Sequence, residues 1–262
     1  MTDAVFHVDG EQHVPTELAR GPWDPNAQHG GAAAAILGRT VERFQPELGL
    51  AVTRMTFEIL RPVPLVPFVV TTAMTRPGKR VQLVTASLQA DEVELVRATA
   101  LRVLPVPRDI PDGLDAPDEP PPPPSAAAPI ERPIAQERPT SFGDAFEMRL
   151  AGGQPFGTPG PSRTWFRLRV PLVAGEEPSP LQRLLVAADF GNGISGVLDF
   201  ERFMFINPDL TVYVRRPPAG VWVGLDATTW LERNGGGYAE SALYDERGRI
   251  GRAVQALYVA PR

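Results

Sequence analysis

Apolar and polar residues alternate along two long regions of the chain, and these regions are rich in Val, Ile, Thr, Tyr and Phe. This alternation is typical of half-buried β-strands. The first region contains four such segments, residues 52–60, 68–74, 81–89 and 93–104. The second contains four more, residues 211–214, 221–231, 237–244 and 251–259. We therefore expect two groups of four antiparallel strands joined by short hairpins.

An apolar helix is predicted ahead of each group of strands. Gly30 and Gly31 precede the segment AAAAILGRTVERF, and Ser179 and Pro180 precede LQRLLVAADF. Serine is a favourable N-cap, and proline suits the first helical turn. One apolar helix followed by antiparallel strands predicts an α+β architecture in which a curved sheet wraps around the helix.

The two groups of strands are related by a constant shift in residue number. Adding 155 to positions of the first half pairs identical residues across more than forty positions, as in Thr56 with Thr211, Arg61 with Arg216, Leu88 with Leu243, and Ala98 with Ala253. Such a register is hard to obtain by chance. The sequence therefore predicts a tandem duplication.

A proline-rich stretch separates the two halves. Twelve of the 30 prolines lie between Pro105 and Pro139, including the run Pro120 to Pro124. Proline lacks the backbone N–H that a ladder needs and favours extended conformations. We interpret residues 105–140 as a linker between an N-terminal domain, 1–104, and a C-terminal domain, 141–262. A recognition motif for a proline-binding partner is the alternative.

Composition narrows the classes of function. The chain of 262 residues has no cysteine and a net charge of −5, which excludes disulfide scaffolds and thiolate nucleophiles and disfavours a nucleic acid partner. No apolar run approaches the roughly 20 residues that span a bilayer, and the N-terminus lacks signal-peptide character. Three scattered histidines do not have zinc-site spacing. We expect a soluble, cytoplasmic protein without a metal site or a membrane partner.

Comparison of the two halves locates candidate chemistry. Polar residues of the second half stand opposite apolar residues of the first at three positions: Asp189 opposite Ala34, Asn207 opposite Val52 and Gln255 opposite Ala100. A carboxylate held by amides can orient a water molecule and accept its proton, so we predict a hydrolytic trio. Singly, Asp189 could end a helix, Asn207 could belong to a turn and Gln255 could bridge two strands.

Residues at the start of the first helix are candidates for substrate binding. Backbone N–H groups at a helix N-terminus stabilise a developing oxyanion, and Gly30 and Gly31 allow a substrate to approach the backbone closely. His29 either contacts the substrate or caps the helix. One half would then supply the oxyanion pocket and the other the water.

Several motifs, taken in order, resemble a known family. They are HGG before an alanine-rich helix, a strand ending in Arg-Pro, the proline linker, and then AADFGN, INPDL, RRPP, LYDERGRI and AVQALYV. This arrangement resembles the acyl-CoA thioesterase II family and its thioesterase-like relatives. The resemblance implies a double hotdog with sheets joined edge to edge. It also implies hydrolysis of a fatty acyl-CoA to free acid and coenzyme A, without metal, other cofactor or covalent acyl-enzyme.

The resemblance also implies catalytic roles for Asp189, Asn207 and Gln255, with one departure. Asn207 stands where the best-known members of the family have a hydroxyl. This difference leaves open a double hotdog that binds acyl-CoA or another acyl ligand without turnover. A hydratase or dehydratase of the same fold is a further alternative, for which His29 would have to serve. Hotdog sheets commonly associate further, so a homo-oligomer is also open.

Overall fold

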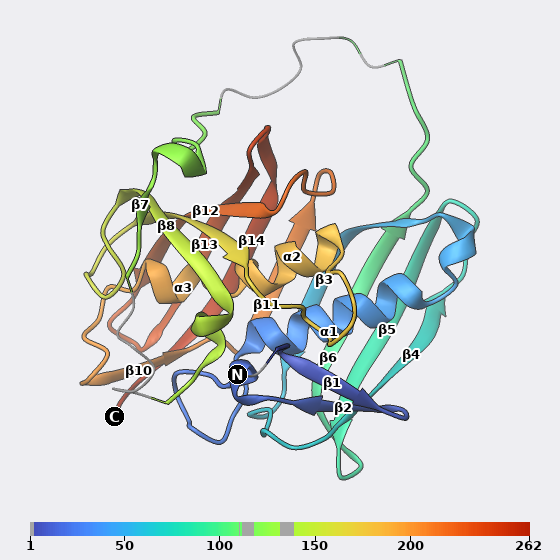
Figure 1. Ribbon diagram of the computed structural model, residues 1–262, viewed down its shortest axis with the longest axis horizontal. Helices are drawn as coiled ribbons and strands as arrows, with labels where there is room; N and C mark the ends of the chain where they lie inside the picture. The colour runs from blue at the N-terminus through green and yellow to red at the C-terminus, as the bar shows by residue number, and fades with distance from the viewer. Residues whose placement is uncertain (1–2, 110, 112–117, 132–138) are drawn as a thin grey trace.

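The computed structural model describes residues 3–109, 111, 118–131 and 139–262. Within these residues the chain forms one twelve-stranded sheet and a separate two-stranded hairpin (Figure 1). All pairings between the strands of the large sheet are antiparallel. The order across it is β4-β5-β6-β3-β11-β14-β13-β12-β9-β8-β7, and β10 pairs with β14.

The helices and strands have the following bounds. The N-terminal half contains β1 (Phe6–Asp9), β2 (Gln12–Pro15), α1 (Gly30–Arg43), β3 (Ala51–Ile59), β4 (Val69–Arg76), β5 (Val81–Ala90) and β6 (Val93–Val103). The remainder contains β7 (Ala128–Pro129), β8 (Phe146–Gly153), β9 (Ser162–Leu168), α2 (Pro180–Ala188), α3 (Gly191–Ile194), β10 (Phe203–Ile206), β11 (Asp209–Val214), β12 (Trp222–Leu231), β13 (Gly236–Asp245) and β14 (Gly248–Pro261). Short 3₁₀ turns occupy residues 17–19, 46–48, 124–126 and 142–145.

The eight predicted strands and both predicted helices are confirmed, with small shifts at their ends. Strands β1, β2, β7, β8, β9 and β10 and the short helix α3 were not predicted. The Ser179 hydroxyl caps α2 by accepting a hydrogen bond from the Gln182 N–H at 3.1 Å, as expected.

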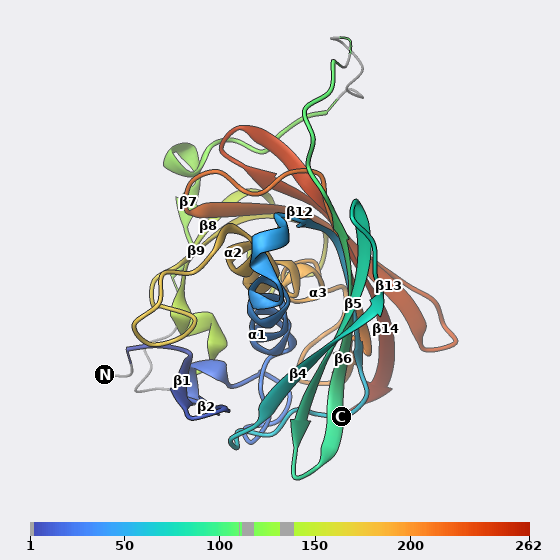
Figure 2. The same cartoon turned by 90° about the vertical axis from the view of Figure 1, so that its right-hand side faces the viewer.

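The curved sheet wraps around α1 and α2, which pack against each other inside it (Figure 2). Helix α1 buries an almost unbroken run from Gly31 to Arg39. Glycine at position 38 allows the two helices to lie this close, because a β-carbon there would be 2.3 Å from Leu185 Cδ1. The two helices therefore share one apolar core with the inner face of the sheet.

The halves meet at strands β3 and β11. Thr56 and Thr211 face each other across this antiparallel pair, and their hydroxyls lie 3.2 Å apart. Arg54 pairs with Tyr213, and Glu58 with Asp209, so residues related by the 155 offset exchange places around a local two-fold axis. The edge-to-edge junction of the two halves is thus built from equivalent strands.

The helices do not keep the 155 offset. Helix α1 begins at Gly30 and α2 at Pro180, so counted from the helix starts Asp189 corresponds to Arg39. The pairing of Asp189 with Ala34 was therefore wrong. A ladder enforces register between strands, whereas a helix can shift along its axis when the loop before it changes length.

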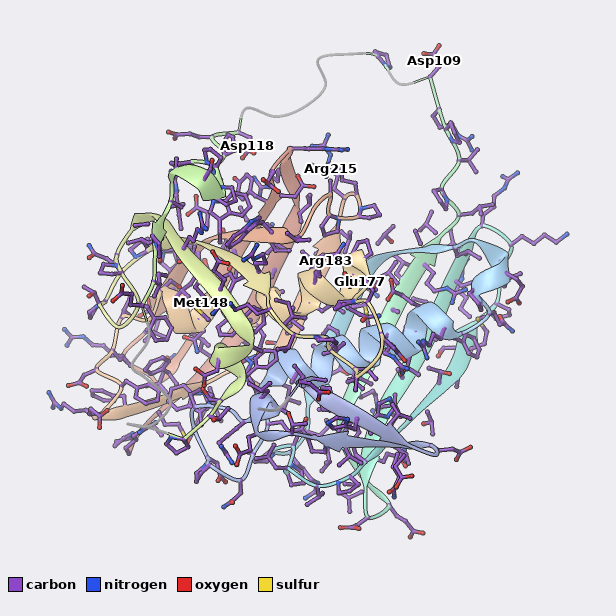
Figure 3. All side chains as sticks on the ribbon, viewed as in Figure 1. Asp109, Asp118, Met148, Glu177, Arg183 and Arg215 are labelled. Carbon is purple, nitrogen blue, oxygen red and sulfur yellow. The ribbon has the colours of Figure 1, made fainter. Side chains whose placement is uncertain are left out.

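Part of the proline-rich stretch packs on the C-terminal half. Every third residue from Pro121 through Pro124 to Ala127 is buried, which matches the three-residue period of a polyproline helix. The Trp165 indole N–H donates to the Pro122 carbonyl at 2.7 Å, and the Tyr244 hydroxyl donates to Asp118, labelled in Figure 3, at 2.8 Å.

The described part of this stretch also joins the sheet, since β7 pairs with β8. Two residues of the predicted linker, Ala128 and Pro129, thus belong to the sheet. Residues 110, 112–117 and 132–138 of the predicted linker lie outside the described residues.

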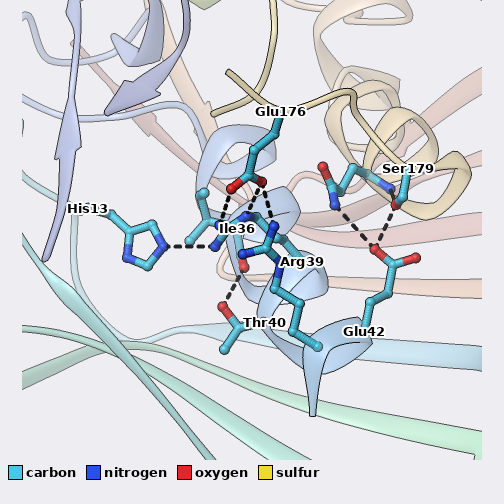
Figure 4. Close-up of polar contacts among 9 residues, drawn as sticks. His13, Ile36, Arg39, Thr40, Glu42, Glu176 and Ser179 are labelled. Atoms are coloured by element: carbon cyan, nitrogen blue, oxygen red, sulfur yellow. Dashed lines mark hydrogen bonds and ion pairs between the residues drawn. The ribbon is translucent and has the colours of Figure 1, made fainter. Parts of the chain in front are cut away.

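A polar cluster ties the C-terminal end of α1 to the segment that precedes α2 (Figure 4). Arg39 makes a two-pronged ion pair with Glu176 at 2.5 and 2.7 Å. Glu42 accepts hydrogen bonds from Ser179 and Gln182 at 2.6 and 3.3 Å. His13 lies 3.4 Å from Arg39 and stacks on Phe68. These contacts hold the two antiparallel helices in register.

No helix within the described ranges is both long enough and apolar enough to cross a membrane.

Candidate active site

The Asp189 side chain lies at the centre of a polar group formed by both halves. Asp189 caps the C-terminus of α2, and its side chain is 4% exposed. Its Oδ1 accepts hydrogen bonds from Asn207 Nδ2 at 2.9 Å and from Gln255 Nε2 at 2.8 Å. The structure therefore brings the three residues of the predicted hydrolytic trio together at one carboxylate oxygen.

Each amide is fixed in orientation by a second contact. Asn207 follows β10 and also donates from Nδ2 to the Asp209 carbonyl at 3.1 Å. Gln255 on β14 accepts from the Asn192 backbone N–H at 3.1 Å through Oε1. Because Oε1 takes this N–H, the Gln255 amide group must point its donors at Asp189.

Two of the structural alternatives are also met, because Asp189 ends α2 and Asn207 lies in a short connection between strands. The Asn192 N–H donates to Gln255 instead of to Asp189. Gln255 bridges a strand to α3 and to Asp189 rather than to a neighbouring strand. Asn207 occupies the short connection between β10 and β11, so it is both a connecting residue and a partner of Asp189.

His29 is the N-cap of α1 and also contacts Asp189. Its Nδ1 accepts from the Gly31 N–H at 3.0 Å and lies 3.0 Å from Asp189 Oδ2. Accepting from Gly31 requires a lone pair on Nδ1, whereas donating to Asp189 requires a proton there. When Nδ1 carries a proton, His29 donates to the Asp189 carboxylate and no longer caps α1. When Nδ1 carries no proton, His29 caps α1.

The N-terminus of α1 is directed at Asp189. A β-carbon on Gly30 would lie 2.7 Å from Asp189 Oδ2, and one on Gly31 would lie 3.0 Å from the Val186 carbonyl oxygen. Both glycines are thus needed for close approach of the helices. The Gly31 N–H is already bonded to His29, so only Gly30 of the predicted pair keeps its N–H for a substrate oxyanion.

Two cavities meet at Asp189. The first, of about 620 Å³, is lined mainly by apolar side chains, including Ala33, Ala34, Phe57, Ile59, Leu60, Val63, Val96, Met204, Ile206 and Leu210. The second, of about 730 Å³, lies over the C-terminal half and is lined by His29, Phe156, Asn192, Asp199, Phe200 and Phe205 among others. Trp23, Gln28, Gly30, Asp189 and Asn207 line both.

This arrangement suits an elongated ligand that extends into both cavities and whose reactive centre lies at Asp189. Sizes of 300–1,000 Å³ are usual for ligand pockets. Sequence reasoning did not single out Gln28, which directly precedes the HGG motif, or Asn192, which is the last residue of AADFGN. Among the described residues, no three His, Asp or Glu side chains cluster closely enough to hold a metal ion.

Solved structures of similar fold are hotdog proteins and thioesterases. A hotdog-fold protein from Alicyclobacillus acidocaldarius is 18% identical with a TM-score of 0.75, over 98% of this chain and 97% of that one. A thioesterase II candidate from Thermobifida fusca is 18% identical with a TM-score of 0.76, over 98% and 96%. Acyl-CoA thioesterase II TesB2 from Mycobacterium marinum is 16% identical with a TM-score of 0.64, over 94% and 96%. The chain is therefore a protein of the hotdog fold with a large antiparallel sheet.

Family models define the chain more narrowly. Residues 19–103 match the acyl-CoA thioesterase N-terminal domain, and residues 111–259 match the acyl-CoA thioesterase C-terminal domain. Among curated proteins, no sequence matches this chain. The chain belongs to the acyl-CoA thioesterase family, which confirms the resemblance found in its motifs.

Proposed function

We propose that this protein hydrolyses a fatty acyl-CoA to the free acid and coenzyme A by direct attack of water. The observation that carries the proposal is the position of the Asp189 carboxylate, which lies where an apolar and a more polar cavity meet and is held there by two amide donors. We further propose that the chain is an α+β double hotdog, with domains 1–104 and 141–262. The separate family matches to the two halves support this division.

Asp189 acts as the general base in this mechanism. Its carboxylate accepts a proton from water while the water oxygen attacks the thioester carbonyl carbon. The C–S bond then breaks, and the coenzyme A thiolate leaves and takes up a proton. Asn207 and Gln255 hold the base in position through Oδ1, so Oδ2 is the oxygen that faces His29 and the N-terminus of α1.

The Gly30 N–H stabilises the oxyanion of the tetrahedral intermediate. Gly30 begins α1 and lines both cavities beside Asp189. An N–H at the first helical position has no partner within its own helix, and the helix dipole favours negative charge at this end. The acyl chain occupies the apolar cavity, because burial of its methylene groups there is favourable.

Release of free thiol from a series of acyl-CoAs tests the proposal, and the absence of cysteine removes any protein background. Asp189→Asn should lower kcat by on the order of 10²-fold or more. Asp9→Asn, which changes an exposed carboxylate on β1 outside both cavities, is the control and should retain the rate. If no acyl-CoA releases thiol above the uncatalysed rate, the thioesterase proposal fails and the alternative of binding without turnover remains.

The contact between His29 and Asp189 favours one second candidate, hydration of an enoyl-CoA. A hydratase of this fold needs a His–Asp pair, and His29 Nδ1 lies 3.0 Å from Asp189 Oδ2. Loss of enoyl absorbance without thiol release would identify this activity. Thiol release without loss of the double bond would exclude it.

A further inference from the structure

Two buried amide oxygens have no hydrogen-bond partner among the described residues. They are Gln28 Oε1 and Asn192 Oδ1. Gln28 is 8% exposed and Asn192 is 5% exposed. A buried polar atom without a partner is unfavourable and is uncommon in folded proteins.

The amide groups cannot relieve this by rotating. Gln28 Nε2 donates to the Pro64 carbonyl at 2.7 Å, and Asn192 Nδ2 donates to the Phe205 carbonyl at 2.9 Å. A flipped amide would place its oxygen against a carbonyl oxygen in each case. The free end of both side chains is therefore the acceptor.

Both residues belong to the larger cavity of about 730 Å³, which meets the apolar cavity at Asp189. Asn192 is joined to the proposed site through its N–H to Gln255, and Gln28 directly precedes His29 in the chain. Both side chains thus line this cavity near the carboxylate, and each carries one buried neutral acceptor without a partner. Neutral acceptors without partners select N–H or O–H donors and disfavour anionic groups such as phosphate, which can only accept.

We propose that Gln28 and Asn192 determine specificity by each accepting one amide N–H of a pantetheine arm. This inference rests on the proposed function, since it places the thioester at Asp189 with the acyl chain in the apolar cavity. A pantetheine arm carries two secondary amides in series beyond its sulfur, which matches two acceptors in one cavity. The arm can be that of coenzyme A or of a carrier protein.

Thioesters of one acyl group on three thiols test this assignment. Pantetheine supplies two amides, N-acetylcysteamine supplies one and ethanethiol supplies none. We expect the wild-type kcat/KM to fall at each step, because a site built to bond an N–H discriminates against analogues that lack it. Gln28→Leu and Asn192→Leu should each reduce the discrimination at one step by roughly 3- to 10-fold, the range for one neutral hydrogen bond.

The ratio between thioesters is the readout, since general damage lowers all three rates together. Gln182→Leu removes a buried amide outside both cavities and should leave the ratios unchanged. If a leucine variant does not fold, Gln28→Met or Asn192→Ser replaces it. The kcat/KM ratios of the wild-type protein between the three thioesters test the proposal without any variant. This inference is overturned if the wild-type protein has equal kcat/KM values for the three thioesters. It is also overturned if both variants keep the same kcat/KM ratios as the wild-type protein. Neither result would affect the proposed function.

Absence of turnover with every thioester would instead overturn the proposed function, and this inference with it. Comparing acyl-CoA and an acyl-carrier protein with acyl-pantetheine identifies the source of the arm. A gain in kcat/KM with acyl-CoA points to coenzyme A, and a gain with the protein points to a carrier.

Discussion

Asp189 Oδ2 occupies the space beside the α-carbon of Gly30, so that a β-carbon there would lie only 2.7 Å away. Asp189 of the C-terminal half is thus in van der Waals contact with Gly30, the first residue of α1 in the N-terminal half. Any side chain at Gly30 must displace the carboxylate or separate the helices.

Gly30→Ala should therefore lower kcat/KM by on the order of 10²-fold, since small displacements of reacting groups cost that much. Thiol release with acyl-CoA measures the effect, and circular dichroism shows whether the fold is retained. Gly236→Ala is the control, because Gly236 lies outside both cavities and a β-carbon there would meet only the Asn234 side-chain oxygen, at 3.3 Å. A folded Gly30→Ala enzyme with the wild-type rate would contradict the proposed position of the base.

Variants of Asn207 test whether this residue serves as a donor to Asp189. Asn207→Ser keeps a donor in the form of a hydroxyl, as in the best-known members of the family, and should retain most of the activity. Asn207→Asp removes the donor and places a second carboxylate about 2.9 Å from Asp189 Oδ1, where like charges repel. We expect it to lower kcat by on the order of 10²-fold. Equal rates for the two variants would show that the donor is not required.

His13 should make the stability of the fold depend on pH. Burial, together with the neighbouring Arg39 and Arg43, lowers the pKa of His13 to about 4, although Glu176 opposes the shift. The unfolded chain binds this proton near pH 6.5. Stability is therefore fully present above pH 6.5 and is lost as the pH falls towards 4.

The loss between pH 7 and pH 5 should be about 2 kcal/mol from this residue. Urea denaturation at the two pH values measures it in wild type and in His13→Gln, which should lose less stability over the same interval. His7→Gln removes an exposed histidine and serves as the control. If His13→Gln loses as much stability as wild type, titration of His13 is not the cause.

Trp165→Phe tests how firmly the proline-rich segment is attached. The variant keeps an aromatic ring between β8 and β12 but removes the indole N–H that donates to the Pro122 carbonyl. We expect a loss of about 1 kcal/mol in the free energy of unfolding. Tyr244→Phe, which removes only the contact to Asp118, should cost no more. An unchanged stability in Trp165→Phe would mean that the segment contributes little through this bond.

Most helices and strands of the fold can be predicted from the sequence, because they depend on patterns of residues close together in the chain. Alternation of apolar residues placed a strand at 81–89, and β5 runs from Val81 to Ala90. Ser179 before Pro180 predicted the start of α2. The 155 offset predicted the duplication, and the structure adds that the equivalent residues Thr56 and Thr211 face each other at the junction.

The sequence predicted the candidate site only in part. Gln255 lies on a strand, where the ladder preserves the offset that pairs it with Ala100 in the other half. Asp189 lies at a helix end, where the offset fails, so its choice depended on the family resemblance as well. The catalytic roles of Asp189, Asn207 and Gln255 stay predictions until the variants are measured.

Alternation, caps and the duplication are properties of residues close together along the chain or related by a fixed shift, and the sequence by itself determined them. Only the tertiary structure decided that His29 meets Asp189, that Pro122 receives the Trp165 N–H, and that Gln28 and Asn192 keep free oxygens. Whether a buried polar atom has a hydrogen-bond partner depends on segments that are distant in the sequence and meet only in the folded protein, so a local sequence pattern cannot predict it.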